Sequence, residues 1–213
     1  MMLKKLKLTT LFFLLFLFVY TSGSENKDDK KNRNLFLTTE LGFYKGTGLS
    51  TDFPHITFVE NGYAKSLRFV AGYFINPHFS AGVGFGADRF ENPGANTFPV
   101  FLDFRGYLKD ARNTPFVFLD AGKTVVFNSQ AQEDGTLLAG GIGYKFFLGK
   151  KTCLIAKAGY NYFNNKEFLW MSTDTDSMEP DADSYRWFYL KRQSATFSIG
   201  LLFRSINDNI YYS

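Results

Sequence analysis

The stretch that decides the fold lies in the first half of the chain and reads Phe79-Ser80-Ala81-Gly82-Val83-Gly84-Phe85-Gly86-Ala87-Asp88. One alternate set of positions is apolar, as at Val83 and Phe85, and the other carries serine, glycine and aspartate. Strict alternation of this kind is typical of a β-strand whose two faces meet different surroundings. The residues just before it, Asn76-Pro77-His78, are the types that form tight turns.

Seven further segments show the same two-residue period, and each of the eight has eleven to fourteen residues. Strands of this length cross a bilayer when tilted, whereas strands of soluble sheets are usually shorter. The eight predicted strands are Leu35–Lys45, Tyr63–Ile75, Phe79–Phe90, Phe98–Leu108, Phe116–Phe127, Leu137–Leu148, Thr152–Asn164 and Lys191–Arg204. We therefore predict an all-β fold, an eight-stranded antiparallel up-and-down transmembrane β-barrel over residues 35–204.

The face that points inward separates two classes of barrel. A soluble barrel of the lipocalin type would turn its apolar face inward. Here the face rich in glycine suits the crowded interior of a small closed barrel, and the bulky apolar face suits lipid. The composition agrees, because 19% of the residues are aromatic while the mean hydropathy is −0.15, slightly polar. After the N-terminus, no segment is apolar enough to be expected to form a transmembrane helix.

The predicted connections alternate in length along the chain. The short ones are Asn76–His78, Lys109–Pro115 and Gly149–Lys151, and the longer ones are Gly46–Gly62, Glu91–Thr97, Asn128–Thr136 and Asn165–Leu190. Outer-membrane barrels have short periplasmic turns and longer outside loops. We therefore expect an outer-membrane protein with both termini in the periplasm and its acidic last loop outside.

The N-terminus has the layout of a secretory signal peptide. Three lysines precede the apolar run Leu11–Tyr20, and small polar residues follow it. A permanent helical anchor is the alternative, but it needs about 20 apolar residues. We assign 1–24 to a cleaved signal peptide, 25–34 to a polar, solvated lead-in and 205–213 to a short periplasmic tail.

Nine charged residues fall on the predicted inner face of the barrel: Glu40, Arg68, Asp88, Asp103, Arg105, Asp120, Lys145, Lys157 and Arg204. Side chains fill the interior of an eight-stranded barrel, and buried charges must pair or cost several kcal/mol. We predict a lumen closed by charge pairs. The alternative is a set of ordinary polar positions in a wet lumen.

Six basic residues keep outward parity at or near the loop-side ends of their strands: Lys45, Lys65, Arg89, Lys123, Lys166 and Lys191. The phosphates of lipopolysaccharide would lie at this level, and lysine and arginine bind phosphate well. We predict a lipid-phosphate belt. The alternative is that strand ends attract charges of any kind and that lysines snorkel to the interface.

Little in the sequence suggests a catalytic, cofactor or metal site. The spacing of His78 and Ser80 is similar to that in outer-membrane lipid A deacylases, but here it falls at the periplasmic end, away from outer-leaflet lipid A. The glycine-rich runs open no helix, so nucleotide binding is not supported. The lone Cys153 provides neither an intramolecular disulfide nor a cysteine cluster, and no basic motif predicts nucleic-acid binding.

The predicted barrel region resembles the outer-membrane β-barrel domain family that includes small OmpA/OmpX-like barrels. The residues that carry this resemblance are 76–86, Phe98-Pro99-Val100-Phe101-Leu102-Asp103-Phe104-Arg105, Pro115-Phe116-Val117-Phe118-Leu119-Asp120-Ala121-Gly122 and Gly140-Gly141-Ile142-Gly143-Tyr144-Lys145-Phe146. The resemblance implies insertion by the barrel-assembly machinery, whose usual signal is a C-terminal strand ending in an aromatic residue. Gly200-Leu201-Leu202-Phe203 looks like that signal, although residues 205–213 follow it.

These observations predict a non-enzymatic barrel with a structural or surface-interaction role through its extracellular loops. Two alternatives stay open, a lipid A-modifying enzyme that uses His78 and Ser80, and a narrow transport or secretion-accessory barrel. The expected partners are outer-membrane lipid, including lipopolysaccharide, and an extracellular or periplasmic protein.

Overall fold

The computed structural model describes residues 32–51, 62–91, 94–125, 132–149, 152–170 and 185–204. The predicted signal peptide, the tail and most of the lead-in lie outside these residues. The strands are β1 (Leu35–Thr51), β2 (Tyr63–Asn76), β3 (Phe79–Glu91), β4 (Gly94–Tyr107), β5 (Thr114–Val125), β6 (Gln132–Phe147), β7 (Thr152–Trp170) and β8 (Tyr185–Arg204).

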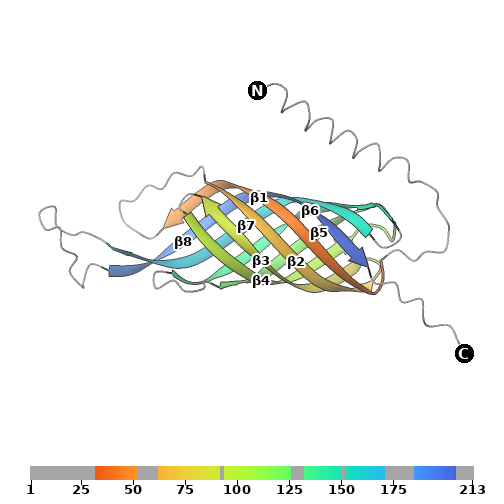
Figure 1. Ribbon diagram of the computed structural model, residues 1–213, viewed down its shortest axis with the longest axis horizontal. Helices are drawn as coiled ribbons and strands as arrows, with labels where there is room; N and C mark the ends of the chain where they lie inside the picture. The colour runs from red at the N-terminus through yellow and green to blue at the C-terminus, as the bar shows by residue number, and fades with distance from the viewer. Residues whose placement is uncertain are drawn as a thin grey trace, which may run out of the picture.

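The eight strands form one closed barrel in which every strand pairs with its neighbours in sequence (Figure 1). All pairs are antiparallel, and β8 closes the ring by pairing with β1. Among the described residues, no helix is long and apolar enough to cross a membrane. The predicted eight-stranded up-and-down barrel is confirmed.

Burial alternates along the strands and shows which face is outside. In β2, from Tyr63 to Phe74, exposed or half-exposed residues alternate with buried residues. The outward positions carry exposed apolar residues, for example Leu41, Val83 and Ile142. The apolar face therefore points outward, as expected for a barrel in lipid and opposite to a lipocalin.

The register fixes the tilt of the strands. Cross-strand partners can be followed from Phe79 once around the barrel, and the path returns to β3 at Arg89, ten residues further along. A stagger of ten residues over eight strands corresponds to a tilt of about 40°. A row of partners therefore climbs as it goes around the barrel.

The two ends of the barrel differ in their connections. We call the end with the connections after β2, β4 and β6 the turn end, and the opposite end the loop end. At the turn end β1 begins and β8 finishes. The β2–β3 connection is the two residues Pro77 and His78, and the Asn76 side chain accepts hydrogen bonds from the backbone nitrogens of His78 and Phe79.

Several loop-end boundaries differ from the prediction. Glu91–Thr97 was expected to be a longer loop, but the connection is only residues 92 and 93, because Glu91 already pairs with Gly94. The sequence Asn-Pro-Gly there has the residue types of a tight turn. The strand at Leu35 was expected to stop at Lys45, and it continues to Thr51 because its outer half pairs with β8.

The predicted loop Asn165–Leu190 is also partly wrong, because β7 runs to Trp170 and β8 starts at Tyr185. Pairs such as Phe168↔Trp187 continue the ladder, and aromatic residues favour strands. The residues around Asn164 are polar and lack the apolar alternation of a strand, so the sequence did not predict that the strand continues. The β7–β8 hairpin thus projects past the other strands, at the left of Figure 1.

Asn32, just before β1, is buried against the barrel instead of remaining solvated. Asn34 has φ 66°, a left-handed conformation that asparagine adopts more readily than most residues. Asn32 is fully buried, donates to the Pro77 carbonyl oxygen at 2.8 Å and accepts from Lys145 Nζ. The prediction of a solvated lead-in is wrong at Asn32, because a buried cation there recruits its amide.

Candidate functional site

The lumen contains the charged residues that the alternation placed on the inner face. Eight of the nine are buried, and Arg204 is half-buried at the turn end. Arg204 lies over the Phe147 ring at 5.8 Å. Lys145 contacts Asn32, near the turn end.

Seven of these residues form one continuous chain of ion pairs. Arg105 contacts Asp103 at 2.8 Å and Glu40 at 2.9 Å. Lys157 contacts Glu40 at 3.0 Å and Asp120 at 3.5 Å. Arg68 continues the chain from Asp120, at 3.6 Å, to Asp88, at 3.1 Å.

Lys157 is the link between the two halves of this chain. It stands alone on β7, while Glu40 with its partner Arg105 lies on one side and Asp120 with its partner Arg68 lies on the other. All are nearly inaccessible to solvent. Removing one member of a buried ion pair leaves the charge of its partner uncompensated, which destabilises the fold. Each residue of the chain therefore stabilises the buried charges on either side of it.

Each base of the chain also lies over aromatic rings, which gives the cations a second favourable contact. These contacts are Arg105 over Phe36 at 5.6 Å and Phe116 at 5.7 Å, Arg68 over Tyr44 at 5.6 Å and Phe101 at 5.1 Å, and Lys157 over Phe118 at 4.1 Å. The cations are therefore held by acids and by rings at once.

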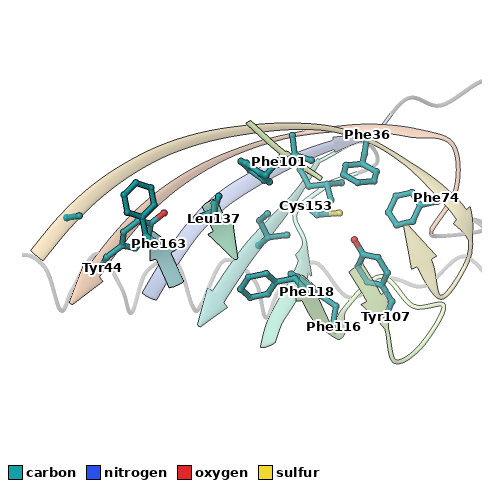
Figure 2. Close-up of a cluster of buried hydrophobic side chains, with 14 of the residues drawn as sticks. Phe36, Tyr44, Phe74, Phe101, Tyr107, Phe116, Phe118, Leu137, Cys153 and Phe163 are labelled. Carbon is teal, nitrogen blue, oxygen red and sulfur yellow. The ribbon is translucent and has the colours of Figure 1, made fainter. Parts of the chain in front are cut away.

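Buried aromatic residues form one group toward each end of the lumen, with Phe101 and Phe118 between the two groups (Figure 2). Toward the turn end, Phe36, Phe74, Tyr107 and Phe116 form a continuous series with ring centroids 4.9 to 5.4 Å apart. Toward the loop end, Phe90 lies 6.5 Å from Tyr44 and 5.4 Å from Phe163. We call these the turn-end and loop-end aromatic layers.

The inward phenylalanine rings were missed, because the inner face was described from the sequence only as rich in glycine and charged residues. Phe36 shares the parity of Glu40, and Phe101 shares the parity of Asp103, so the signal was present. Three of the inward rings fit because a glycine faces each of them across the ladder. The pairs are Phe36↔Gly72, Phe101↔Gly84 and Phe116↔Gly143.

A small cavity of about 20 Å³ lies beside the charge chain, with Asp120, Lys157 and Asn161 in its wall. The buried Asp120 Oδ1 and Asn161 Oδ1 have no hydrogen-bond partner among the described residues. A space of this size with polar walls fits about one water molecule.

The register places the six residues of the predicted lipid-phosphate belt at different heights along the barrel axis. With strands tilted by about 40°, Lys45, Lys65, Arg89 and Lys123 lie within about 4 Å of one level. Lys65 and Arg89 are direct cross-strand partners. Lys191 pairs with Ser50, five residues beyond Lys45 on β1, and therefore lies higher. The backbone of Lys166 lies beyond Lys191, since it pairs with Tyr189.

His78 and Ser80 do not form a catalytic pair in the described residues. His78 is exposed, and its Nδ1 lies 3.1 Å from the Tyr107 carbonyl oxygen, whereas Ser80 is buried in the lumen. No hydrogen bond joins the two side chains in this part of the chain. Nor do the described residues bring together three His, Cys, Asp or Glu side chains that could hold a metal ion.

A closed ring of eight long strands, apolar outside and charged inside, defines a small barrel of the transmembrane type. The chain is similar in structure to the outer membrane protein OprG from Pseudomonas aeruginosa, with TM-score 0.56, 11% identity, and coverage of 84% of this chain and 100% of that one. At this identity the likeness shows a common fold alone.

Two other solved structures share less of the geometry. Neisserial surface protein A gives TM-score 0.47 and 14% identity over 80% of this chain and 97% of its own. Outer Membrane Protein W from E. coli gives TM-score 0.47 and 12% identity over 83% of this chain and 100% of its own. No protein-family model and no curated protein matches the sequence.

Proposed function

We propose that this chain is a non-enzymatic outer-membrane barrel with a closed lumen, which serves as a rigid base for an interaction surface at its loop end. The observation that carries this proposal is the chain of seven ion-paired residues between two aromatic layers. Such an interior is packed with side chains, and moving one of its charges would expose its partner.

The loop end is the natural place for contacts with another molecule. The β7–β8 hairpin projects there, and its outermost described pair, Trp170↔Tyr185, lies beyond the pairing of β7 with β6 at Glu167↔Gln132. Residues 171–184, which lie outside the described part, carry five acids in the sequence. A protein partner outside the cell, or one with a basic surface, would suit this loop.

The outer leaflet supplies a second class of partner. Lys45, Lys65, Arg89 and Lys123 share one level near the loop end, as the phosphates of lipopolysaccharide require. Lys65 is largely exposed and has only a distant ion pair with Glu91, at 3.9 Å. We include lipopolysaccharide contact by these four residues in the proposed function.

Orientation is tested by labelling introduced cysteines on intact cells with a membrane-impermeant maleimide. The single native Cys153 is buried and gives little background. Ser177→Cys, in the last loop, should label on intact cells, and Lys109→Cys, in a turn-end connection, should label only after the outer membrane is permeabilised. Labelling of Lys109→Cys alone on intact cells would contradict the proposal.

A further inference from the structure

A large apolar groove that the proposed function does not use lies on the outer surface of the described strands. Its volume is about 660 Å³, within the range of small-molecule pockets. The groove crosses the strands from β3 to β8. Its floor has small residues, Gly106, Ala156 and Ala158, and bulkier side chains such as Phe79 and Phe197 line it at either end.

The groove follows one row of cross-strand partners. This row is Phe79↔Gly106↔Val117↔Ile142↔Ala158↔Phe197. It starts at the first residue of β3, at the turn end, and spans five strand spacings. At about 4.8 Å per spacing and a tilt of about 40°, the row climbs about 15 Å, half of the hydrocarbon thickness of a bilayer. The groove therefore extends across one leaflet, from the turn-end interface to the bilayer centre.

Small residues open the groove on either side of Val117 and Ile142, namely Gly106 on β4 and Ala156 and Ala158 on β7. A Cβ atom at Gly106 would lie 3.2 Å from Val117 Cγ2 and 3.6 Å from Phe79 Cε1, so a larger side chain would occupy the space between those two residues. Val117 and Ile142 are exposed and form the raised centre of the groove floor. The walls are almost entirely hydrocarbon, which suits an alkyl chain and offers nothing to a polar ligand.

The lower mouth of the groove carries groups that suit a phosphate. His78 lines it, with Nδ1 3.1 Å from the Tyr107 carbonyl oxygen. When both ring nitrogens carry a proton, Nδ1 donates to that oxygen and Nε2 donates to a phosphate oxygen outside. The next connection carries Lys109, Asp110 and Arg112, a net positive set. Cationic and imidazole groups beside an alkyl slot match the phosphate and acyl chain of a phospholipid.

We propose that this groove binds one acyl chain of a phospholipid from the leaflet at the turn end, with the lipid phosphate beside His78. The bound chain is held in the slot and exchanges more slowly than the lipid around the rest of the barrel. This inference rests on the proposed membrane placement, which puts the turn end at the phospholipid leaflet of the outer membrane.

The test is native mass spectrometry of the refolded full-length mature chain in detergent, titrated with dipalmitoylphosphatidylethanolamine. The wild type should form a one-to-one adduct. Ala158→Leu and Ala156→Leu fill the floor and should each weaken the adduct about tenfold or more, since each displaces about two methylenes of contact. Ala71→Leu is the matched control, an exposed alanine outside the groove, and should leave the affinity unchanged.

A second set of measurements tests phosphate binding at His78 separately from acyl-chain binding in the groove. His78→Gln should weaken binding of the phospholipid and leave binding of dipalmitoylglycerol, which has no phosphate, unchanged. Equal binding by wild type and both floor variants would overturn the proposal, as would a preference for lipid A or a dimer in place of the lipid adduct. Failure of the membrane placement itself would show separately, as labelling of Lys109→Cys and not of Ser177→Cys on intact cells.

Discussion

The ring of Phe101 on β4 lies over Gly84 on β3, its direct partner in the ladder, in the space where a larger residue would have its side chain. The Phe36–Gly72 and Phe116–Gly143 pairs repeat this relationship elsewhere in the lumen. A narrow barrel can contain large rings and arginines because glycines opposite the rings make the room. Gly72, Gly84 and Gly143 and the three rings opposite them therefore pack as matched pairs.

Gly84→Ala should destabilise the barrel by about 1–3 kcal/mol, because the added methyl overpacks the Phe101 ring. Urea titration of the barrel in vesicles, followed by gel mobility, measures this free energy of unfolding. Gly140→Ala is the matched control, since its Cβ would meet its nearest neighbours at 3.4 and 3.7 Å, ordinary contact distances. Equal stability of the two variants would show that the ring has space to move.

Lys157→Met should destabilise the barrel by about 3–5 kcal/mol, because it leaves Glu40 and Asp120 each without one cationic partner. The same urea titration provides the measurement. Lys123→Met removes an exposed lysine and should change stability by less than about 0.5 kcal/mol.

A double-mutant cycle distinguishes lost pairing from lost packing at Lys157. Adding Asp120→Asn to Lys157→Met removes the uncompensated charge and should recover part of the lost stability. If the destabilisations by Lys157→Met and Asp120→Asn simply add in the double variant, the 3.5 Å contact between Lys157 and Asp120 contributes no coupling free energy. The seven residues would then not stabilise the barrel as one continuous chain.

Arg89→Gln and Lys123→Gln should each weaken lipopolysaccharide binding about fivefold, since a basic residue at a charged surface contributes about 1 kcal/mol. Lys191→Gln should have little effect, because its partner Ser50 places it above the level of the other two. Calorimetric titration of the refolded barrel with lipopolysaccharide, in detergent at low salt, measures all three. A loss with Lys191→Gln equal to that of the other two would replace the level-specific belt with general attraction to charge.

Alternation alone was enough to place Glu40, Asp103 and Lys157 in the lumen, because the side-chain period of a strand is two and does not depend on its partner. Which charges touch depends on register and stagger. Glu40 meets Arg105, 65 residues away, and Lys157, 117 residues away. No local pattern contains those separations.

The loop-end boundaries were harder to predict for a different reason. Beyond Asn164 the sequence mixes polar and aromatic residues, and the ladder continues there because β7 and β8 already run side by side. The groove was equally invisible in the sequence. Gly106, Ala156 and Ala158 are ordinary small residues on two strands, and only the tilted register lines them up with Phe79 and Phe197.

The closed lumen is tested most directly by the electrical conductance of planar bilayers that contain the refolded barrel, with the heat-modifiable gel band as proof of insertion. The ion-paired chain between the aromatic layers predicts that the inserted wild-type barrel gives no stable conductance steps, under conditions in which an open porin does. Reproducible steps from the wild-type barrel would show a continuous aqueous path through the lumen and would contradict the closed interior.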